Sequence, residues 1–159
     1  MRSPAGNIDG IFVEKIIKME FDPNNHVVQL CLKGMSLEEK DPNEASKVFL
    51  QAWNEATNDF EKFISAHYMA RHQENVIDKL KWLETALQYA LKINDDSVRT
   101  AFPSLYLNIA KCYEDLQDIE NARNYYQLAL SFTGFLEDNG YGKMIKAGIE
   151  NGIKRDSEL

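Results

Sequence analysis

Two of the chain's three histidines lie in one short stretch, AHYMARHQ, which spans residues 66–73. The side chains of His67, Tyr68, Arg71 and His72 include types that can exchange protons, hold a metal ion or bind an anion. On a helix, Tyr68, Arg71 and His72 share one face because they stand three and four positions apart. Arg71 can then hold a carboxylate by two parallel hydrogen bonds.

The alternative to a binding site is a structural role for the same residues. Arg71 then pairs with Glu74 or another acidic neighbour, Tyr68 packs against other side chains, and the histidines are ordinary polar residues of the core or surface. We favour the structural role because no sequence motif accompanies the stretch. The preference is strongest for His67, since a structural histidine is the commoner case.

Metal binding and nucleophilic catalysis are both disfavoured. His67 and His72 are five positions apart, so on a helix their directions diverge by about 140°, whereas two ligands on one face need a spacing of four. His26 is remote in the sequence. Cys31 and Cys112 lie in separate segments without a CxxC motif, so we expect reduced thiols in a cytoplasmic protein. We therefore expect no metal, no cofactor and no catalytic residue.

The composition predicts one all-α domain. The chain has 159 residues, of which 44% are apolar and 27% are charged, and it has 8 glycines and 4 prolines. Long stretches run without a turn signal, and runs that alternate apolar and polar residues are nearly absent. The net charge of −7 argues against binding to nucleic acid or to anionic lipid. The apolar runs are too short for a membrane span.

The pattern of apolar residues and helix-start signals divides the chain into segments. We expect an N-terminal extension over residues 1–24, either a tag or one short helix, then a helical-repeat domain over 25–154 and a tail over 155–159. Asp41 and Pro42 form a helix-start signal. The expected helices are 26–39, 42–56, 59–72, 75–93, 98–116, 119–136 and 143–154.

Large and small residues recur at fixed spacings. Residues 106–129 place an aromatic, an apolar–small pair and a second aromatic on one helix, and a small, an aromatic and a small residue on the next. This segment resembles the tetratricopeptide repeat. Leu83 follows Phe49 by 34 residues, which is the period of that family. The residues that we assign to repeat packing are Gly34, Ala45, Phe49, Ala52, Phe63, His67, Leu83, Ala86, Tyr106, Ala110, Tyr113, Ala122, Tyr126 and Ala129.

The resemblance implies an α-α superhelix of about three antiparallel helix pairs with a C-terminal capping helix. In that family the first helix of each pair lines a concave groove, which binds a protein or peptide. The groove residues implied here are Tyr68, Arg71, His72, Ser104, Asn108 and Lys111. The family's clamp for C-terminal carboxylates needs lysine, asparagine and arginine at set positions, and only Asn108 fits that pattern.

Three functions compete. The resemblance favours a binding adaptor for a protein partner, without catalysis. A structural or homo-oligomerising module is the first alternative, since the apolar stretch IFVEKIIKM offers a contact surface. The second is an enzyme, because small bacterial chains of this kind sometimes carry a methyltransferase label. The sequence has no glycine-rich turn between a strand and a helix and no NPPY-like tetrad, so its motifs do not support that activity.

Overall fold

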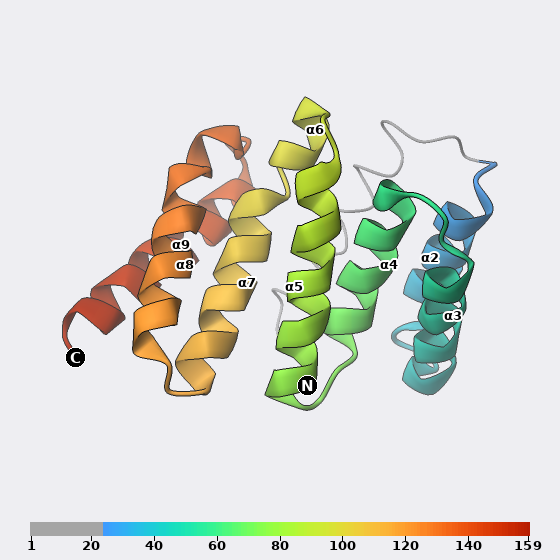
Figure 1. Ribbon diagram of the computed structural model, residues 1–159, viewed down its shortest axis with the longest axis horizontal. Helices are drawn as coiled ribbons and strands as arrows, with labels where there is room; N and C mark the ends of the chain where they lie inside the picture. Colours follow the sequence, from blue (N-terminus) through green and yellow to red (C-terminus); the bar gives the residue numbers. More distant parts are fainter. Residues whose placement is uncertain (1–23) are drawn as a thin grey trace. The chain divides into compact units, whose positions relative to one another are not determined.

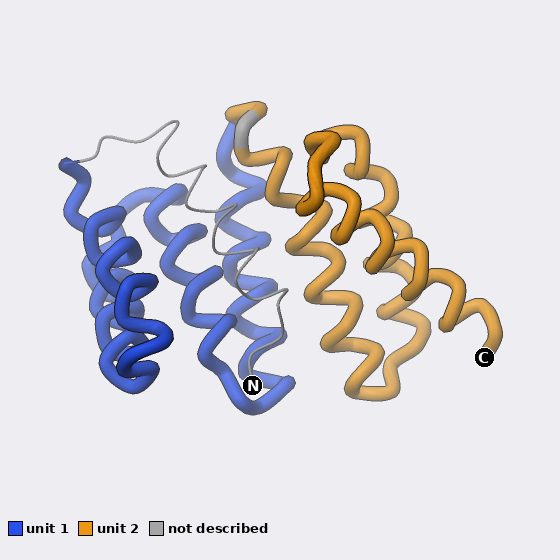
Figure 2. The backbone as a smooth tube through the Cα atoms, turned by 180° about the vertical axis from the view of Figure 1, so that it is seen from behind, with its two compact units in different colours: residues 1–94 blue, residues 95–159 orange. Residues whose placement is uncertain are grey.

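The computed structural model describes residues 24–159, with the exception of the Ser97 side chain (Figure 1). The N-terminal extension expected over residues 1–24 therefore lies outside the described residues, apart from Asn24. Between residues 24 and 159 the structure contains helices and no strand, which confirms the all-α prediction. The chain divides into two compact units, residues up to 94 and residues 95–159, and each is described here by itself (Figure 2).

Unit 1 consists of neighbouring helices that pack in sequence order. They are α2 (His26–Leu37), α3 (Pro42–Glu55), α4 (Asp59–Arg71) and α5 (Val76–Lys92). The helices α2 and α3 form one pair and α4 and α5 form the next, while α4 also contacts α2 and α3. Each helix begins at an Asn or Asp whose side chain accepts a backbone N–H of the first turn, and Asp41 does so for α3 as expected.

Unit 2 repeats this arrangement after a short connecting helix. Its elements are α6 (Asp96–Arg99), α7 (Phe102–Asp115), α8 (Ile119–Ser131), the 3-10 turn η1 (Thr133–Phe135) and α9 (Gly140–Ser157). α7 and α8 form a pair, and α9 packs against both. For the helix expected over residues 98–116, Pro103 predicted either an initial turn that ends there or a kink. The structure has a separate short helix, α6, and places Pro103 in the first turn of α7. α9 also continues through residues that we had assigned to a tail.

The close approach of helices depends on small residues that face aromatic rings. A Cβ atom added to Gly34 of α2 would lie 2.3 Å from the Phe49 ring of α3, and one added to Gly152 of α9 would lie 2.3 Å from the Tyr126 ring of α8. These distances are far below van der Waals contact, so only glycine allows the rings to lie where they do. The same pairing therefore joins neighbouring helices in both units.

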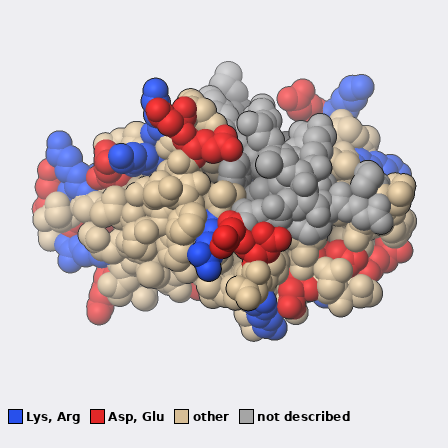
Figure 3. Space-filling view, turned by 90° about the horizontal axis from the view of Figure 1, so that it is seen from above, with Lys and Arg blue, Asp and Glu red and all other residues tan. Residues whose placement is uncertain are grey.

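The surface carries charges of both signs. On the face shown in Figure 3, acidic and basic side chains of the described residues are interspersed, and the described part of this face shows no extended basic patch. None of the helices between residues 24 and 159 has the length and apolar character needed to cross a membrane.

Gly148 and Gly152 of α9 face neighbouring helices. Substituting each of them tests the packing of an aromatic ring against a glycine. Gly152→Ala should lower the melting temperature by several degrees, because the added methyl group collides with the Tyr126 ring and overpacking costs about 1–3 kcal/mol. Thermal unfolding followed by circular dichroism measures this change.

The matched control is Gly148→Ala in the same helix. Its Cβ would lie 3.3 Å from a terminal methyl group of Leu107, which can shift, and alanine gains about 1 kcal/mol of helix propensity. We expect this variant to melt at or above the wild-type temperature. Equal effects of the two substitutions would contradict the packing described here.

Candidate functional site

The predicted groove residues fall three in each unit. Tyr68, Arg71 and His72 belong to unit 1, and Ser104, Asn108 and Lys111 belong to unit 2. Because each unit is described by itself, the two sets are considered separately.

The Tyr68 ring lies in the core of unit 1, as the favoured structural role predicted, and not in the open groove that the family resemblance implied. Its exposed fraction is 0%, it stacks on Phe49 at a centroid distance of 4.9 Å, and its hydroxyl donates to Met35 Sδ at 2.9 Å. The reason is the position of α4, which is in contact with α2, α3 and α5 and is therefore buried on most of its faces. Tyr68 accordingly packs, as the structural alternative proposed.

A buried carboxylate lies next to Arg71 and His72. Glu38, at the end of α2, places Oε2 at 3.1 Å from Arg71 Nη2 and at 3.3 Å from His72 Nε2. The side chains of Glu38 and His72 are each 6% exposed and that of Arg71 is 14% exposed. The acidic partner of Arg71 is thus Glu38 and not its sequence neighbour Glu74. Because the ion pair is largely withdrawn from water, removing either partner would leave an uncompensated buried charge.

His67 is one of the residues that we assigned to repeat packing from the sequence. The residue is 5% exposed, its ring meets the edge of Tyr68 at 5.4 Å, and neither ring nitrogen has a hydrogen-bond partner among the described residues. Burial, reinforced by the nearby positive charge of Arg71, lowers the pKa of His67 to about 3. The imidazole is therefore neutral near pH 7 and is no proton donor there.

The cysteines also lie in the core. Cys31 and Cys112 are both buried, and neither forms a disulfide. Burial raises the pKa of Cys31 to about 12, because the thiolate would lose its hydration. A thiol held in that form is a poor nucleophile.

In unit 2, α7 presents a more open polar face. Ser104 is buried, Asn108 is partly exposed and Lys111 is exposed. The Asn108 amide donates to Ser104 Oγ at 3.4 Å, near the long limit for a hydrogen bond. No acidic side chain between residues 24 and 159 forms an ion pair with Lys111 within 4.0 Å. The side chains of Asn108 and Lys111 therefore place an amide and an ammonium group at the accessible surface of α7.

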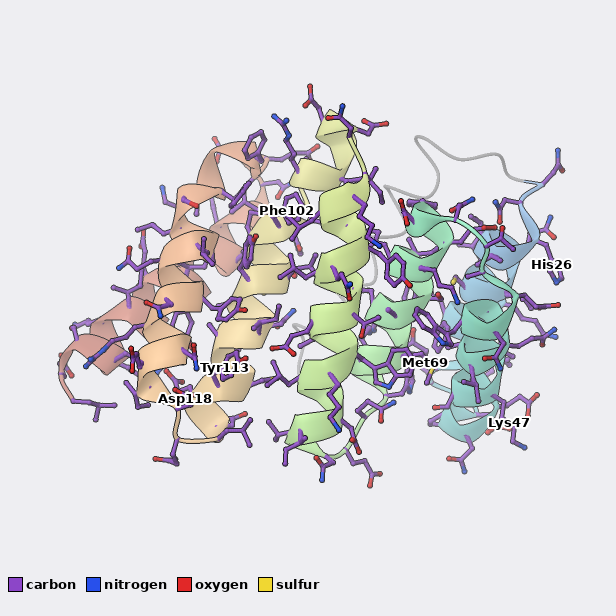
Figure 4. All side chains as sticks on the ribbon, in the orientation of Figure 1. His26, Lys47, Met69, Phe102, Tyr113 and Asp118 are labelled. Carbon is purple, nitrogen blue, oxygen red and sulfur yellow. The ribbon has the colours of Figure 1, made fainter. Side chains whose placement is uncertain are left out.

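The residues assigned to repeat packing lie in the core of their units, with one exception. Tyr113, which is labelled in Figure 4, remains partly exposed. Its ring stacks on Tyr125 of α8 at a centroid distance of 5.4 Å. Sequence reasoning had not identified Glu38 as a candidate, because it stands 33 positions before Arg71 and no local pattern joins them. It also missed an open pocket of about 390 Å³ between η1 and the start of α9, where Lys143 and Lys146 are among the lining residues.

Because the buried His67 imidazole has no hydrogen-bond partner among the described residues, we predict that acid lowers the stability of unit 1. Because the pKa of His67 is lower in the folded state than the usual 6.5, its contribution to stability is complete above pH 6.5 and is lost as the pH falls toward 3. Between pH 7.5 and pH 4 the loss attributable to His67 should be about 3 kcal/mol. His67→Leu, of similar volume, should remove this part of the acid sensitivity.

Urea unfolding followed by tryptophan fluorescence measures the effect, because Trp53 and Trp82 are both in unit 1 with ring centroids 5.1 Å apart. His26→Leu is the matched control, since it makes the same substitution at a side chain that is 62% exposed and lies at the surface, 3.3 Å from the exposed Glu55. If His67→Leu loses as much stability in acid as the wild-type chain, the buried neutral histidine is not the cause.

Comparison with known proteins gives one match. The family model described as tetratricopeptide repeat matches residues 103–133, which span most of α7, all of α8 and the turn between them. Neither the curated proteins nor the solved structures give a match to the chain. The matched segment includes Asn108 and Lys111. The resemblance read from residues 106–129 is thus supported, and residues 103–133 are similar to a tetratricopeptide repeat.

Proposed function

We propose that this chain is a protein-interaction module that holds a peptide segment of a partner on the polar face of α7. The observation that carries the proposal is the coincidence of the repeat match at residues 103–133 with Asn108 and Lys111 on the accessible side of the same helix. Repeats of this family commonly serve protein interactions.

The chemistry of these two side chains fits an extended peptide. The carboxamide of Asn108 has both a donor and an acceptor, so it can pair with the N–H and C=O groups of a peptide backbone. The ammonium group of Lys111, three positions further on, can take a carboxylate of the same segment. We therefore expect an acidic side chain or a chain terminus in the bound segment.

We assign the contact to α7 and not to α4 because the polar groups of α4 are already engaged or enclosed. Tyr68 is buried and Arg71 is paired with Glu38. A ligand carboxylate would have to displace Glu38 from its cation, and the displaced carboxylate would then lie unpaired in the core. The cluster of Glu38, Arg71 and His72 is better suited to joining α2 to α4 than to binding.

The proposal includes the absence of catalysis. A doubly wound fold that binds a nucleotide cofactor requires a parallel sheet, and residues 24–159 contain no strand. The cysteine with a resolved shift, Cys31, has a pKa raised to about 12, and the neutral His67 is enclosed. These features support a binding role over an enzymatic one, and the two free buried thiols fit the cytoplasmic location that we expect.

Substituting the α7 face should release the partner while leaving the fold intact. We expect the double variant Asn108→Ala and Lys111→Glu to lose proteins that the wild-type chain captures from a lysate of its source cells, as identified by mass spectrometry. For a peptide taken from a captured protein, binding should weaken by about tenfold to hundredfold, since hydrogen bonds to charged groups contribute about 1.5–3 kcal/mol. Titration calorimetry measures the affinity.

The matched control is Lys146→Glu, which makes the same charge change at an exposed position of α9 in the same unit. It should keep both the captured proteins and the peptide affinity. Circular dichroism should show equal helicity for all variants. Unchanged binding by the α7 variant, or equal losses in variant and control, would exclude the α7 face as the site.

The enzymatic alternative makes its own prediction. A methyltransferase that takes its methyl group from S-adenosylmethionine must bind that cofactor, whereas a binding module has no use for it. Titration calorimetry with S-adenosylmethionine should therefore show no saturable heat up to millimolar concentrations. Binding in the micromolar range would refute the assignment as non-enzymatic.

A further inference from the structure

The end of α9 carries a buried carboxyl group that no described N–H or O–H group satisfies. Asp156 is 1% exposed, and neither of its side-chain oxygens has a hydrogen-bond partner in the described part of the chain when it is taken as a carboxylate. Glu114 of α7 has one oxygen, Oε2, in the same condition. The two carboxyl groups lie within hydrogen-bonding reach of each other. Two carboxylates repel, but a carboxylic acid donates well to a carboxylate.

The two arginines near this pair do not contact the Asp156 carboxyl group. Arg155 Nη2 donates to Glu114 Oε1 at 2.9 Å and to the Tyr126 hydroxyl at 3.2 Å. Arg123 of α8 donates through Nε to the backbone carbonyl of Asp156 at 2.9 Å, and its Nη2 reaches the same carbonyl. Both guanidinium groups thus hold α9 to its neighbours, yet neither forms an ion pair with the Asp156 carboxyl group. Because neither arginine bridges the two carboxyl groups, a proton shared between them is the group that can join Asp156 to Glu114.

The two carboxyl groups differ in their affinity for the proton. Burial, the hydrogen bond with Glu114 and the negative charge of Glu114 raise the pKa of Asp156 to about 6. Burial acts upward on the pKa of Glu114 too, but hydrogen bonds with Asp156 and Arg155 outweigh it, and the net pKa is lowered. Asp156 is accordingly the carboxylic acid, and Glu114 is the carboxylate that accepts its hydrogen bond.

We propose that the last turns of α9 are a proton-operated latch, closed by a hydrogen bond from protonated Asp156 to Glu114 and opened when this proton leaves. The groups that face the latch come from each element packed there: Glu114 from α7, Arg123 and Tyr126 from α8, and Arg155 from α9 itself. The inference concerns the docking of α9 and stands whether or not α7 binds a peptide.

The sign of the pH dependence follows from the raised pKa of Asp156 in the docked state. The stabilising contribution of the latch is present in acid and is lost as the pH rises through about 6. Between pH 5 and pH 7.5 the equilibrium constant for docking should fall about tenfold. At the higher pH the end of α9 separates more often from α7 and α8, and the surface around Tyr126 and Glu114 becomes accessible. In this proposal, the end of α9 covers that surface in acid and exposes it more often at higher pH.

Hydrogen exchange of the full chain, measured by mass spectrometry on peptides from residues 150–159, tests the latch. We expect the protection factors, corrected for the intrinsic pH dependence of exchange, to fall about tenfold from pH 5 to pH 7.5 in the wild-type chain. Asp156→Asn should keep similar protection at both pH values, because its amide donates to Glu114 without a titrating proton. Glu114→Gln should do the same, since its amide donates to the Asp156 carboxylate.

The matched control is Glu158→Gln, an exposed acidic position on the same helix end, which should retain the wild-type pH dependence. The two latch variants alter opposite partners, so one of them suffices if the other fails to fold. A wild-type protection factor that does not change with pH would overturn the proposal. A tenfold fall in the protection factor that persists in a folded Asp156→Asn or Glu114→Gln variant would also overturn it.

Discussion

The contact on which both units depend is an aromatic ring seated on a glycine of the neighbouring helix. Phe49 lies against Gly34 in unit 1, and Tyr126 lies against Gly152 in unit 2. The small residue lets two helix axes approach, and the ring then fills the groove between them, so that neither helix has to expose its apolar side. Phe49 also stacks on Tyr68 of α4, which extends this single contact into the next helix.

Most of the fold could be predicted from the sequence because this contact requires small and aromatic residues at regular spacings along the chain. Alanines and rings at fixed spacings identified the helix pairs, and Asp41 and Pro42 marked the start of α3. The break between α6 and α7 was harder to predict, since Pro103 is compatible both with a kink inside a helix and with the first turn of a new one. The end of α9 was missed because Arg155 and Asp156 look like a solvated terminus in the sequence, whereas in the structure both residues contact α7 or α8.

The candidate sites were less predictable than the fold. Helical spacing correctly placed Tyr68, Arg71 and His72 near one another, but it could not show that α4 is enclosed by three helices. Nor could it find Glu38, because a pair separated by 33 positions has no local signature. The buried polar groups also respond to protons in opposite directions. We predict that acid weakens unit 1 through His67 and strengthens the docking of α9 through Asp156.

The distribution of the two thiols has a practical consequence. Cys31 is in unit 1 and Cys112 is in unit 2, and both are buried thiols outside any disulfide. A thiol reagent can reach either sulfur only when the surrounding helices separate, so the rate of labelling at each cysteine reports how often its own unit opens under native conditions. A single labelling time course, resolved by peptide mass, would therefore yield two separate opening free energies from one unmodified polypeptide.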